Sequence, residues 1–218
     1  KGTYKRELRA PPKSQRILHV CTELGPIGGL ASMLTRLIKQ DTTRQHSVIV
    51  TRPGSDVPAS IAEATAGSGG TIRLLTKRPS NYPARALELR QVAREYDLIV
   101  LHIYSEDVLP LLAFARLTDV PPVLYLNHAD HLFWLGSSVS DVVINLRESG
   151  QNLSIYRRGI ASERNVLVPT LIKKPDRKRA VEDAKRELGL APDSILLVSV
   201  ARGIKYRTHN KITFADTH

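Results

Sequence analysis

Two adjacent glycines, Gly28 and Gly29, follow the apolar run 17–20 and precede an amphipathic stretch that begins at Leu30. Such a turn lets the backbone change direction, because glycine adopts positive φ angles without steric cost. It can also aim free backbone N–H groups and a helix N-terminus at an anion, most often a phosphate. The local sequence leaves both interpretations open.

The glycine pair matches neither of two familiar nucleotide-binding motifs. The pattern G-x-G-x-x-G is absent and no acidic residue ends the second apolar run, so a nicotinamide cofactor is not expected. The Gly-Lys-Ser/Thr of a P-loop is also absent. Hydrolase chemistry has little support, since the chain lacks Gly-x-Ser-x-Gly.

A second group of reactive side chains lies in the stretch 127–131, which reads Asn-His-Ala-Asp-His and follows an apolar run. A histidine at this place can hydrogen-bond a substrate hydroxyl or transfer a proton near neutral pH. A purely structural role is the competing interpretation of His128. Asp130 and His131 are further candidates, but no third ligand at suitable spacing accompanies these side chains, so we expect no metal.

Other histidines fall within predicted strands. His102 ends the strand predicted at 97–102 and is a weaker candidate than His128 for contact with a substrate. His19 and His46 are interpreted as structural.

Positive charge dominates the composition, with a formal net charge of +11 over 218 residues and a pI near 10.0. This balance favours anionic partners: nucleotide phosphates, an acidic membrane surface or nucleic acid. Nucleic acid is disfavoured because zinc-ligand spacing and aromatic-rich basic strands are absent. No apolar run approaches the roughly 20 residues of a spanning helix. We expect a cytoplasmic protein, with membrane association left open.

Short β-branched runs alternate with helical patterns along the chain. The predicted strands are 16–22, 46–51, 71–75, 97–102, 122–127, 141–145 and 165–168. The predicted helices are 30–40, 57–66, 81–95, 105–117, 147–158 and 179–189. Several strands are apolar on both faces, as in a parallel sheet covered by helices. The alternation predicts an α/β fold with a doubly wound, Rossmann-like parallel sheet flanked by helices.

Ligands of such sheets bind outside the carboxyl ends of the strands, near the point where the strand order reverses. The loops at these ends are predicted at 22–29, 52–57, 103–107 and 128–137. The glycine pair and His128 both lie on them.

The chain is organised into four segments. A basic leader at 1–15 precedes an N-terminal Rossmann-like domain at 16–172, and a basic linker and helix follow at 173–193. An apolar strand predicted at 195–200 then opens a second α/β domain, truncated over 194–218. Because a lone strand cannot bury its own faces, we expect the chain to be a fragment, whose unpaired strand offers a route to a truncation-induced dimer.

Four features occur in an order that resembles a known family. They are the turn at Gly28 and Gly29 with its helix, the strand that ends in Asn127-His128, the segment 140–149, and the bridge 185–190 leading to 198–202. The chain resembles the group 1 retaining glycosyltransferases, nucleotide-sugar-dependent enzymes with the GT-B fold of two facing Rossmann-like domains. The resemblance covers most of residues 16–208 and identifies 16–172 as the acceptor-side domain, the N-terminal half of a GT-B architecture.

The resemblance implies transfer of a sugar, with retention, from a nucleotide-sugar donor to a hydroxyl of an acceptor glycan, lipid or small molecule. The donor is a substrate, so no cofactor is implied. Gly28 and Gly29 would line the cleft beside the donor phosphate and the acceptor. His128 would hydrogen-bond the transferred sugar or stabilise charge near the reacting carbon.

The resemblance also implies a role for cations late in the chain. Arg202 and Lys205 would neutralise the leaving diphosphate. They stand closer together than the family usually places this pair, so Arg207 could replace either. The family's acidic donor-binding motif is absent from these residues, and we therefore expect the chain alone to be inactive.

A different class of function remains open beside the transferase. The chain could be a noncatalytic α/β module that binds an anionic polymer such as nucleic acid through its basic surface. The two interpretations differ in salt response, because binding through many phosphate contacts weakens steeply with salt.

Overall fold

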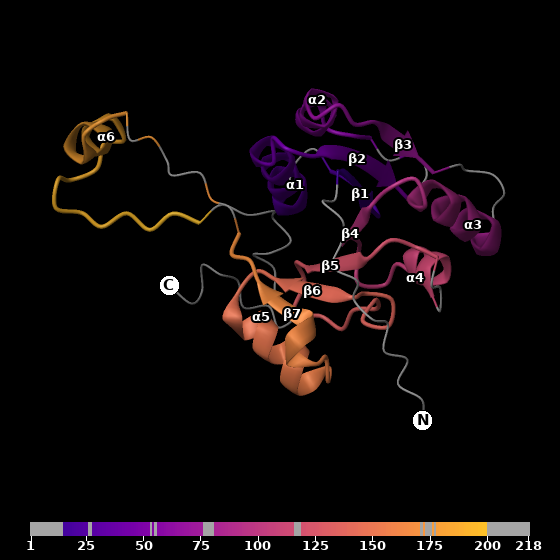
Figure 1. Cartoon of the computed structure of the whole chain (residues 1–218). Helices are drawn as coiled ribbons and strands as arrows, with labels where there is room; N and C mark the ends of the chain where they lie inside the picture. Colours follow the sequence, from indigo (N-terminus) through magenta and orange to yellow (C-terminus); the bar gives the residue numbers. More distant parts are fainter. Residues whose placement is uncertain are drawn as a thin grey trace. The chain divides into compact units, whose positions relative to one another are not determined.

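The computed structural model describes residues 15–25, 28–52, 54, 56–75, 81–115, 119–170, 172, 176 and 178–199. The chain divides into two compact units, Lys1–Ile172 and Lys173–His218. The first unit is built on a single sheet with helices against it (Figure 1). Within the described residues, no helix has the length and apolar character needed to cross a membrane.

The sheet has seven strands, all parallel, in the order β3-β2-β1-β4-β5-β6-β7. These strands are β1 (Arg16–Cys21), β2 (Gln45–Val50), β3 (Ile72–Leu74), β4 (Leu98–His102), β5 (Val123–Asn127), β6 (Val142–Asn145) and β7 (Asn165–Leu167). The predicted α/β fold with a Rossmann-like parallel sheet is confirmed. Because β1 pairs with both β2 and β4, the strand order reverses between β1 and β4.

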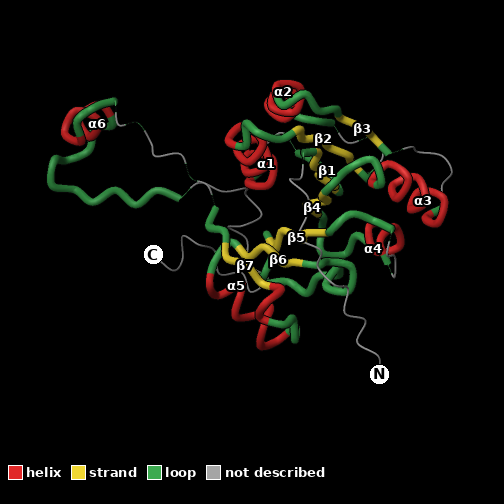
Figure 2. Tube along the Cα trace, in the orientation of Figure 1, coloured by secondary structure: helices red, strands yellow, loops and turns green. Residues whose placement is uncertain are grey.

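The connections between strands are mostly helical (Figure 2). The helices are α1 (Gly29–Gln40), α2 (Ala59–Gly67), α3 (Tyr82–Ala93), α4 (Leu109–Phe114) and α5 (Glu148–Asn152), which continues as a π-helical turn, η1 (Leu153–Arg157), before a 3-10 turn, η2 (Ser162–Arg164). Alternate residues of a strand point to opposite faces of a sheet. Leu18 and Val20 of β1 pack with α3 and α4, whereas Cys21 packs with α1 and α2, so each helix pair covers one face.

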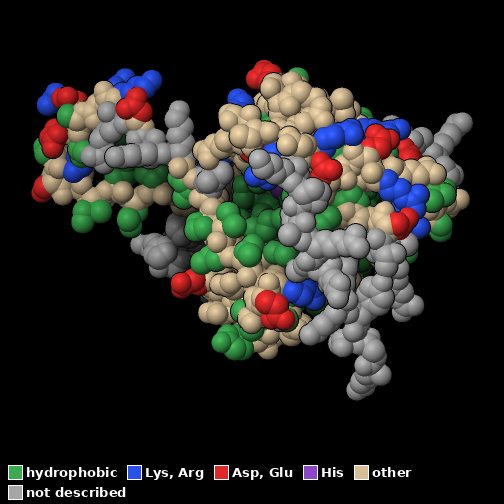
Figure 3. Space-filling view, in the orientation of Figure 1, with side chains coloured by type: hydrophobic (Ala, Val, Ile, Leu, Met, Phe, Trp, Pro, Cys, Tyr) green, Lys and Arg blue, Asp and Glu red, His purple; other side chains and the backbone are tan. Residues whose placement is uncertain are grey.

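On the sheet face that α1 and α2 cover, here called the α1 face, the described helices do not extend over β6 and β7. Val142 and Ile144 of β6 are only half-buried, and Val166 of β7 is exposed. In the space-filling view, hydrophobic side chains gather at the centre of the face drawn, between the positions of α1 and α5 (Figure 3). Apolar surface of the first unit therefore remains open to solvent in the described part of the chain.

The helix predicted over 105–117 is shorter in the structure and begins only at Leu109. Oδ1 of Asp107 accepts the N–H of Leu109 at 3.0 Å, and Pro110 follows in the first turn. Both features favour a helix start at this point. Residues 103–107 are thereby free to form a loop at the carboxyl end of β4.

The second unit contains α6 (Val181–Glu187). Gly189 adopts φ +66° just after this helix, a conformation that favours glycine and ends the helix where the sequence predicts it. The strand predicted at 195–200 is not formed over 195–199, where the apolar side chains are exposed. A strand needs a neighbour to pair its backbone groups, and none lies beside this stretch within the described residues.

Candidate functional site

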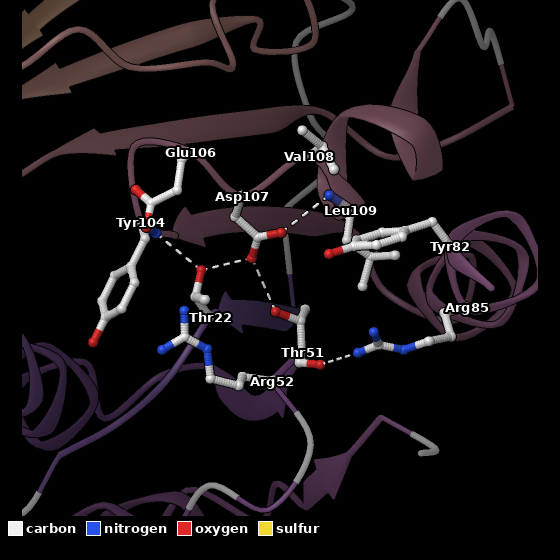
Figure 4. A pocket seen from close by; sticks show the side chains of 10 residues that line it. All are labelled: Thr22, Thr51, Arg52, Tyr82, Arg85, Tyr104, Glu106, Asp107, Val108 and Leu109. Atoms are coloured by element: carbon white, nitrogen blue, oxygen red, sulfur yellow. Dashed lines mark hydrogen bonds between the residues drawn. The ribbon is translucent and has the colours of Figure 1, made fainter. Parts of the chain in front are cut away.

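A pocket of about 170 Å³ lies at the carboxyl ends of β1, β2 and β4, where the strand order reverses. Its walls come from the residues that follow these strands and from the first turn of α3: Thr22, Thr51, Arg52, Tyr82, Arg85, Tyr104, Glu106, Asp107, Val108 and Leu109 (Figure 4). The location agrees with the loops predicted after these strands. Open α/β sheets bind their ligands at such a switch point.

Asp107 connects the residues that follow β1, β2 and β4 by hydrogen bonds at this pocket. Its Oδ2 accepts hydrogen bonds from the hydroxyls of Thr22 at 2.6 Å and Thr51 at 3.0 Å, as Figure 4 shows. The Thr22 hydroxyl in turn accepts the N–H of Tyr104 at 2.9 Å. Because Asp107 also holds the N–H of Leu109, its carboxylate organises the loops around the pocket.

Arginine and tyrosine side chains form the rest of the wall. Arg52 pairs with Glu23 and lies over the Tyr104 ring, 5.1 Å from its centroid. Arg85 donates to the carbonyl oxygen of Thr51, and its buried Nε has no hydrogen-bond partner among the residues that the structure describes. Guanidinium donors and aromatic ring faces, with carboxylates beside them, suit a ligand rich in hydroxyl or anionic groups.

His128 lies at the carboxyl end of β5 and is half-buried. Its Nδ1 is 3.3 Å from the carbonyl oxygen of Leu126. A carbonyl oxygen can only accept, so the proton resides on Nδ1 and Nε2 is left as an acceptor. Burial lowers the pKa of His128 below its ordinary value, against the opposing effect of this hydrogen bond, and the ring is neutral at pH 7.

His102 is fully buried at the end of β4. Burial, and then the nearby His128, lower the pKa of His102 to about 3. The structure thus brings these two predicted histidines close together. The Nδ1 of His102 has no hydrogen-bond partner among the described residues.

Asp130 is engaged in contacts within the protein, and His131 lies beside it at the surface. Asp130 is buried and receives two hydrogen bonds from Arg147, at 2.6 and 2.5 Å, which lower the pKa of its carboxyl despite burial. The backbone carbonyl of Asp130 accepts from Arg158 at 2.9 Å. His131 is largely exposed, with its Nδ1 3.7 Å from Asp130. Asp130 therefore braces the loop after β5 against the segment of α5 and η1.

The glycine pair stands at the start of α1 without a steric reason for glycine. Gly28 has φ 166°, which is extended backbone that any residue adopts, and Gly29 begins the helix. A Cβ added to either would meet no atom of the described residues within 4 Å. No side chain of the described residues caps the N-terminus of α1, and a helix N-terminus of this kind favours an anion.

The remaining candidates lie at the end of the chain. Arg202, Lys205 and Arg207 lie outside the described residues. Within the described ranges, no group of three or more His, Cys, Asp or Glu side chains is arranged to hold a metal ion.

Among the predicted site residues that the structure describes, none lines the pocket. Thr22, Thr51 and Asp107 were missed because an isolated threonine or aspartate carries no motif. Their one sequence signal is position, since Thr22 and Thr51 end predicted strands and Asp107 ends a predicted loop. Their convergence depends on the pairing of β1 with β4, which no local pattern reveals.

No family model matches the sequence, and no curated protein matches it. Among solved structures, Anabaena Alr3699/HepE in complex with UDP and glucose matches with a TM-score of 0.53 at 15% sequence identity. The same protein in complex with UDP-glucose matches with a TM-score of 0.53 at 16% identity. Each match covers 80% of this chain and 50% of the other, so this chain spans about half the length of that neighbour. At these identities the likeness shows the fold.

Proposed function

We propose that this chain is the acceptor-side half of a retaining glycosyltransferase with GT-B architecture, which moves a sugar from a nucleotide-sugar donor to an acceptor hydroxyl. The observation that carries the proposal is the fold likeness to about half of HepE, a protein solved with UDP and with UDP-glucose. The pocket at the carboxyl ends of β1, β2 and β4 suits a polar ligand.

The pocket beside Asp107 takes part of the acceptor in this proposal. Its lining offers donors from Arg52 and Arg85 and acceptors from Glu106, with tyrosine rings on two sides. Sugars and sugar phosphates present hydroxyl and anionic groups that match such a lining. The chemical type of the acceptor, glycan, lipid or small molecule, is left open by these contacts.

His128 contacts the transferred sugar in this proposal. Its neutral ring offers the Nε2 lone pair as an acceptor for a sugar hydroxyl. The acceptor oxygen bonds to the anomeric carbon on the face from which the diphosphate departs, and the bond from that carbon to the phosphate oxygen breaks. A diphosphate oxygen takes the proton of the acceptor hydroxyl, so His128 need not act as a base.

The departing diphosphate requires cations and N–H donors in a closed site. Arg202 and Lys205, with Arg207 as substitute, are proposed for this role, because a guanidinium or ammonium group neutralises phosphate charge.

The experiment that tests the proposal measures release of nucleoside diphosphate from UDP-, GDP- and ADP-sugars by the protein encoded by the complete reading frame. We expect release from one nucleotide class and its loss in an Arg202→Ala, Lys205→Ala double variant. The matched control is an Arg94→Ala, Lys39→Ala double variant, which removes an arginine paired with Asp119 at the surface and an exposed lysine of α1.

The opposite result identifies the alternative. If the complete protein releases no diphosphate with any donor, yet binds single-stranded DNA or RNA with an affinity that falls steeply with salt, the transferase proposal is wrong. The net charge of +11 then serves polymer binding.

A further inference from the structure

Three buried histidines on adjacent strands form a continuous chain of ring-to-ring contacts in the sheet. His46 of β2, His19 of β1 and His102 of β4 are each fully buried. The Nε2 of His19 lies 2.9 Å from Nδ1 of His46, and its Nδ1 lies 3.0 Å from Nε2 of His102. Strand register places these rings side by side on the α1 face.

A carboxylate stands at one end of this chain. Asp41, just after α1, has its Oδ2 3.3 Å from Nε2 of His46. Oδ1 of Asp41 accepts from the N–H and the hydroxyl of Thr43, and Oδ2 also faces Arg44 at 3.1 Å. Burial alone would raise the pKa of Asp41, but these groups hold it below its usual value, so the carboxylate is ionised.

The contacts between neutral rings allow only two consistent arrangements of protons. Each ring-to-ring hydrogen bond needs one N–H and one lone pair, and each neutral ring carries a single N–H. All three rings are therefore protonated on Nε2, or all three on Nδ1. The second arrangement would place the Nε2 lone pair of His46 3.3 Å from the ionised Asp41, which is repulsive. The first places an N–H there, which is electrostatically favourable although the contact lacks the geometry of a hydrogen bond among the described residues.

We propose that Asp41, His46, His19 and His102 form a directed histidine relay, in which Asp41 fixes the proton on Nε2 of every ring and leaves Nδ1 of His102 as an acceptor. That nitrogen is the buried ring atom of His102 without a partner among the described residues. It lies at the carboxyl end of β4, close enough for His128 to affect the charge of the ring. Asp41, at the far end of the relay, is thus a positioning residue that acts on His102 through the two intervening rings.

The relay goes beyond the proposed function, since the positions of its protons follow from the ring contacts and from Asp41 whether or not the protein transfers a sugar. The groups that face it are Arg44 beside Asp41 at one end and His128 at the other. All three rings are neutral at pH 7, because burial is the leading cause that lowers the pKa of each. A measurement near neutral pH of which ring nitrogen carries the proton therefore tests the relay directly.

The test is long-range proton–nitrogen correlation NMR on the whole chain labelled with ¹⁵N-histidine, which separates a protonated ring nitrogen from a bare one. We expect His19, His46 and His102 all to carry the proton on Nε2. A wild-type spectrum with Nδ1 of His102 protonated would overturn the proposal without recourse to any variant.

Asp41→Asn tests whether the carboxylate sets the direction. With Oδ1 still held by Thr43, the new amide N–H₂ faces Nε2 of His46 and donates to it, so the tautomers should switch and His102 should become protonated on Nδ1. The matched control is Asp119→Asn, a surface aspartate paired with Arg94, which should leave all three tautomers unchanged. Unchanged tautomers in a folded Asp41→Asn protein would show that Asp41 does not direct the relay.

Discussion

The proton of His128 is held by the backbone of its own strand, and this decides what the side chain can offer a ligand. The contact with the carbonyl oxygen of Leu126 places the N–H on Nδ1 and leaves Nε2 as an acceptor. The lowered pKa keeps this acceptor available in mildly acidic solution.

Two substitutions of His128 distinguish the loss of its hydrogen bond to the sugar from the loss of its side-chain volume. In the complete protein, His128→Ala should lower kcat/KM for diphosphate release by about 10-fold, the value of one hydrogen bond to a ligand. His128→Gln supplies an amide oxygen near the position of Nε2 and should recover most of this loss. The pH profile of wild-type kcat/KM should stay flat down to pH 6.5 and fall only below it, because the pKa of His128 is lowered and its protonation removes the acceptor. Equal activity of the Ala and wild-type proteins would exclude a contact with the sugar.

Asp107 has a structural task that can be measured without any ligand. Asp107→Ala leaves the hydroxyls of Thr22 and Thr51 and the N–H of Leu109 without their acceptor. We expect a loss of about 1–3 kcal/mol in the free energy of unfolding. Urea denaturation followed by circular dichroism measures it, with Asp119→Ala as the exposed control, which should change stability by less than about 0.5 kcal/mol. A loss no larger than that of the control would contradict the assigned role.

At the scale of elements, α5 is fitted closely against the loop after β5. A Cβ on Gly150 would lie 2.4 Å from Oδ2 of Asp130 and 3.1 Å from its Cβ and Cγ. Asp130 cannot swing aside without breaking its paired contacts with Arg147. The glycine therefore allows the loop that carries His128 to rest on α5.

Gly150→Ala should consequently destabilise the protein by about 1–3 kcal/mol, the usual cost of overpacking. Gly67→Ala is the matched control, because a Cβ there would meet nothing within 4 Å at the end of α2. That change should be neutral or stabilising by up to about 1 kcal/mol. Thermal melts of the two variants would refute the packing argument if their midpoints shifted equally.

At the scale of the whole molecule, the buried histidines make stability depend on pH. The pKa of His102 is about 3 and that of His19 is also well below 6.5, whereas both rings titrate near 6.5 in the unfolded chain. Below pH 6.5 the unfolded chain binds protons that the folded chain does not, so acid favours unfolding. Stability is fully present above pH 6.5 and falls as the pH decreases below it.

The expected slope is about 1.4 kcal/mol per pH unit for each of the two rings. Urea midpoints between about pH 7.5 and about pH 5 measure it, and a steep decrease is the expected result. His131→Ala, which removes an exposed histidine, should keep the slope. A stability that is constant over this range would mean that the buried rings take up protons in the folded state.

The sequence predicted the elements well and the site only in outline. Continuous apolar runs made the strands of the parallel sheet recognisable, and the loops predicted at their carboxyl ends contain several of the residues that line the pocket. Side chains that act over long separations escaped prediction: Asp107 shortens α4, and the rings of His19, His46 and His102 meet only through strand register. The stretch 195–199 shows the opposite error, because an apolar pattern alone does not supply a partner strand.

The central position of β1 has a consequence for synthesis of the protein. β1 is made before both of its partners, and its second partner, β4, follows about 80 residues later. At a translation rate of about 5–20 residues per second, one edge of β1 therefore waits roughly 4–16 s for its neighbour. During that interval an apolar strand edge is exposed on the nascent chain, where chaperones or other nascent chains can reach it before the sheet closes.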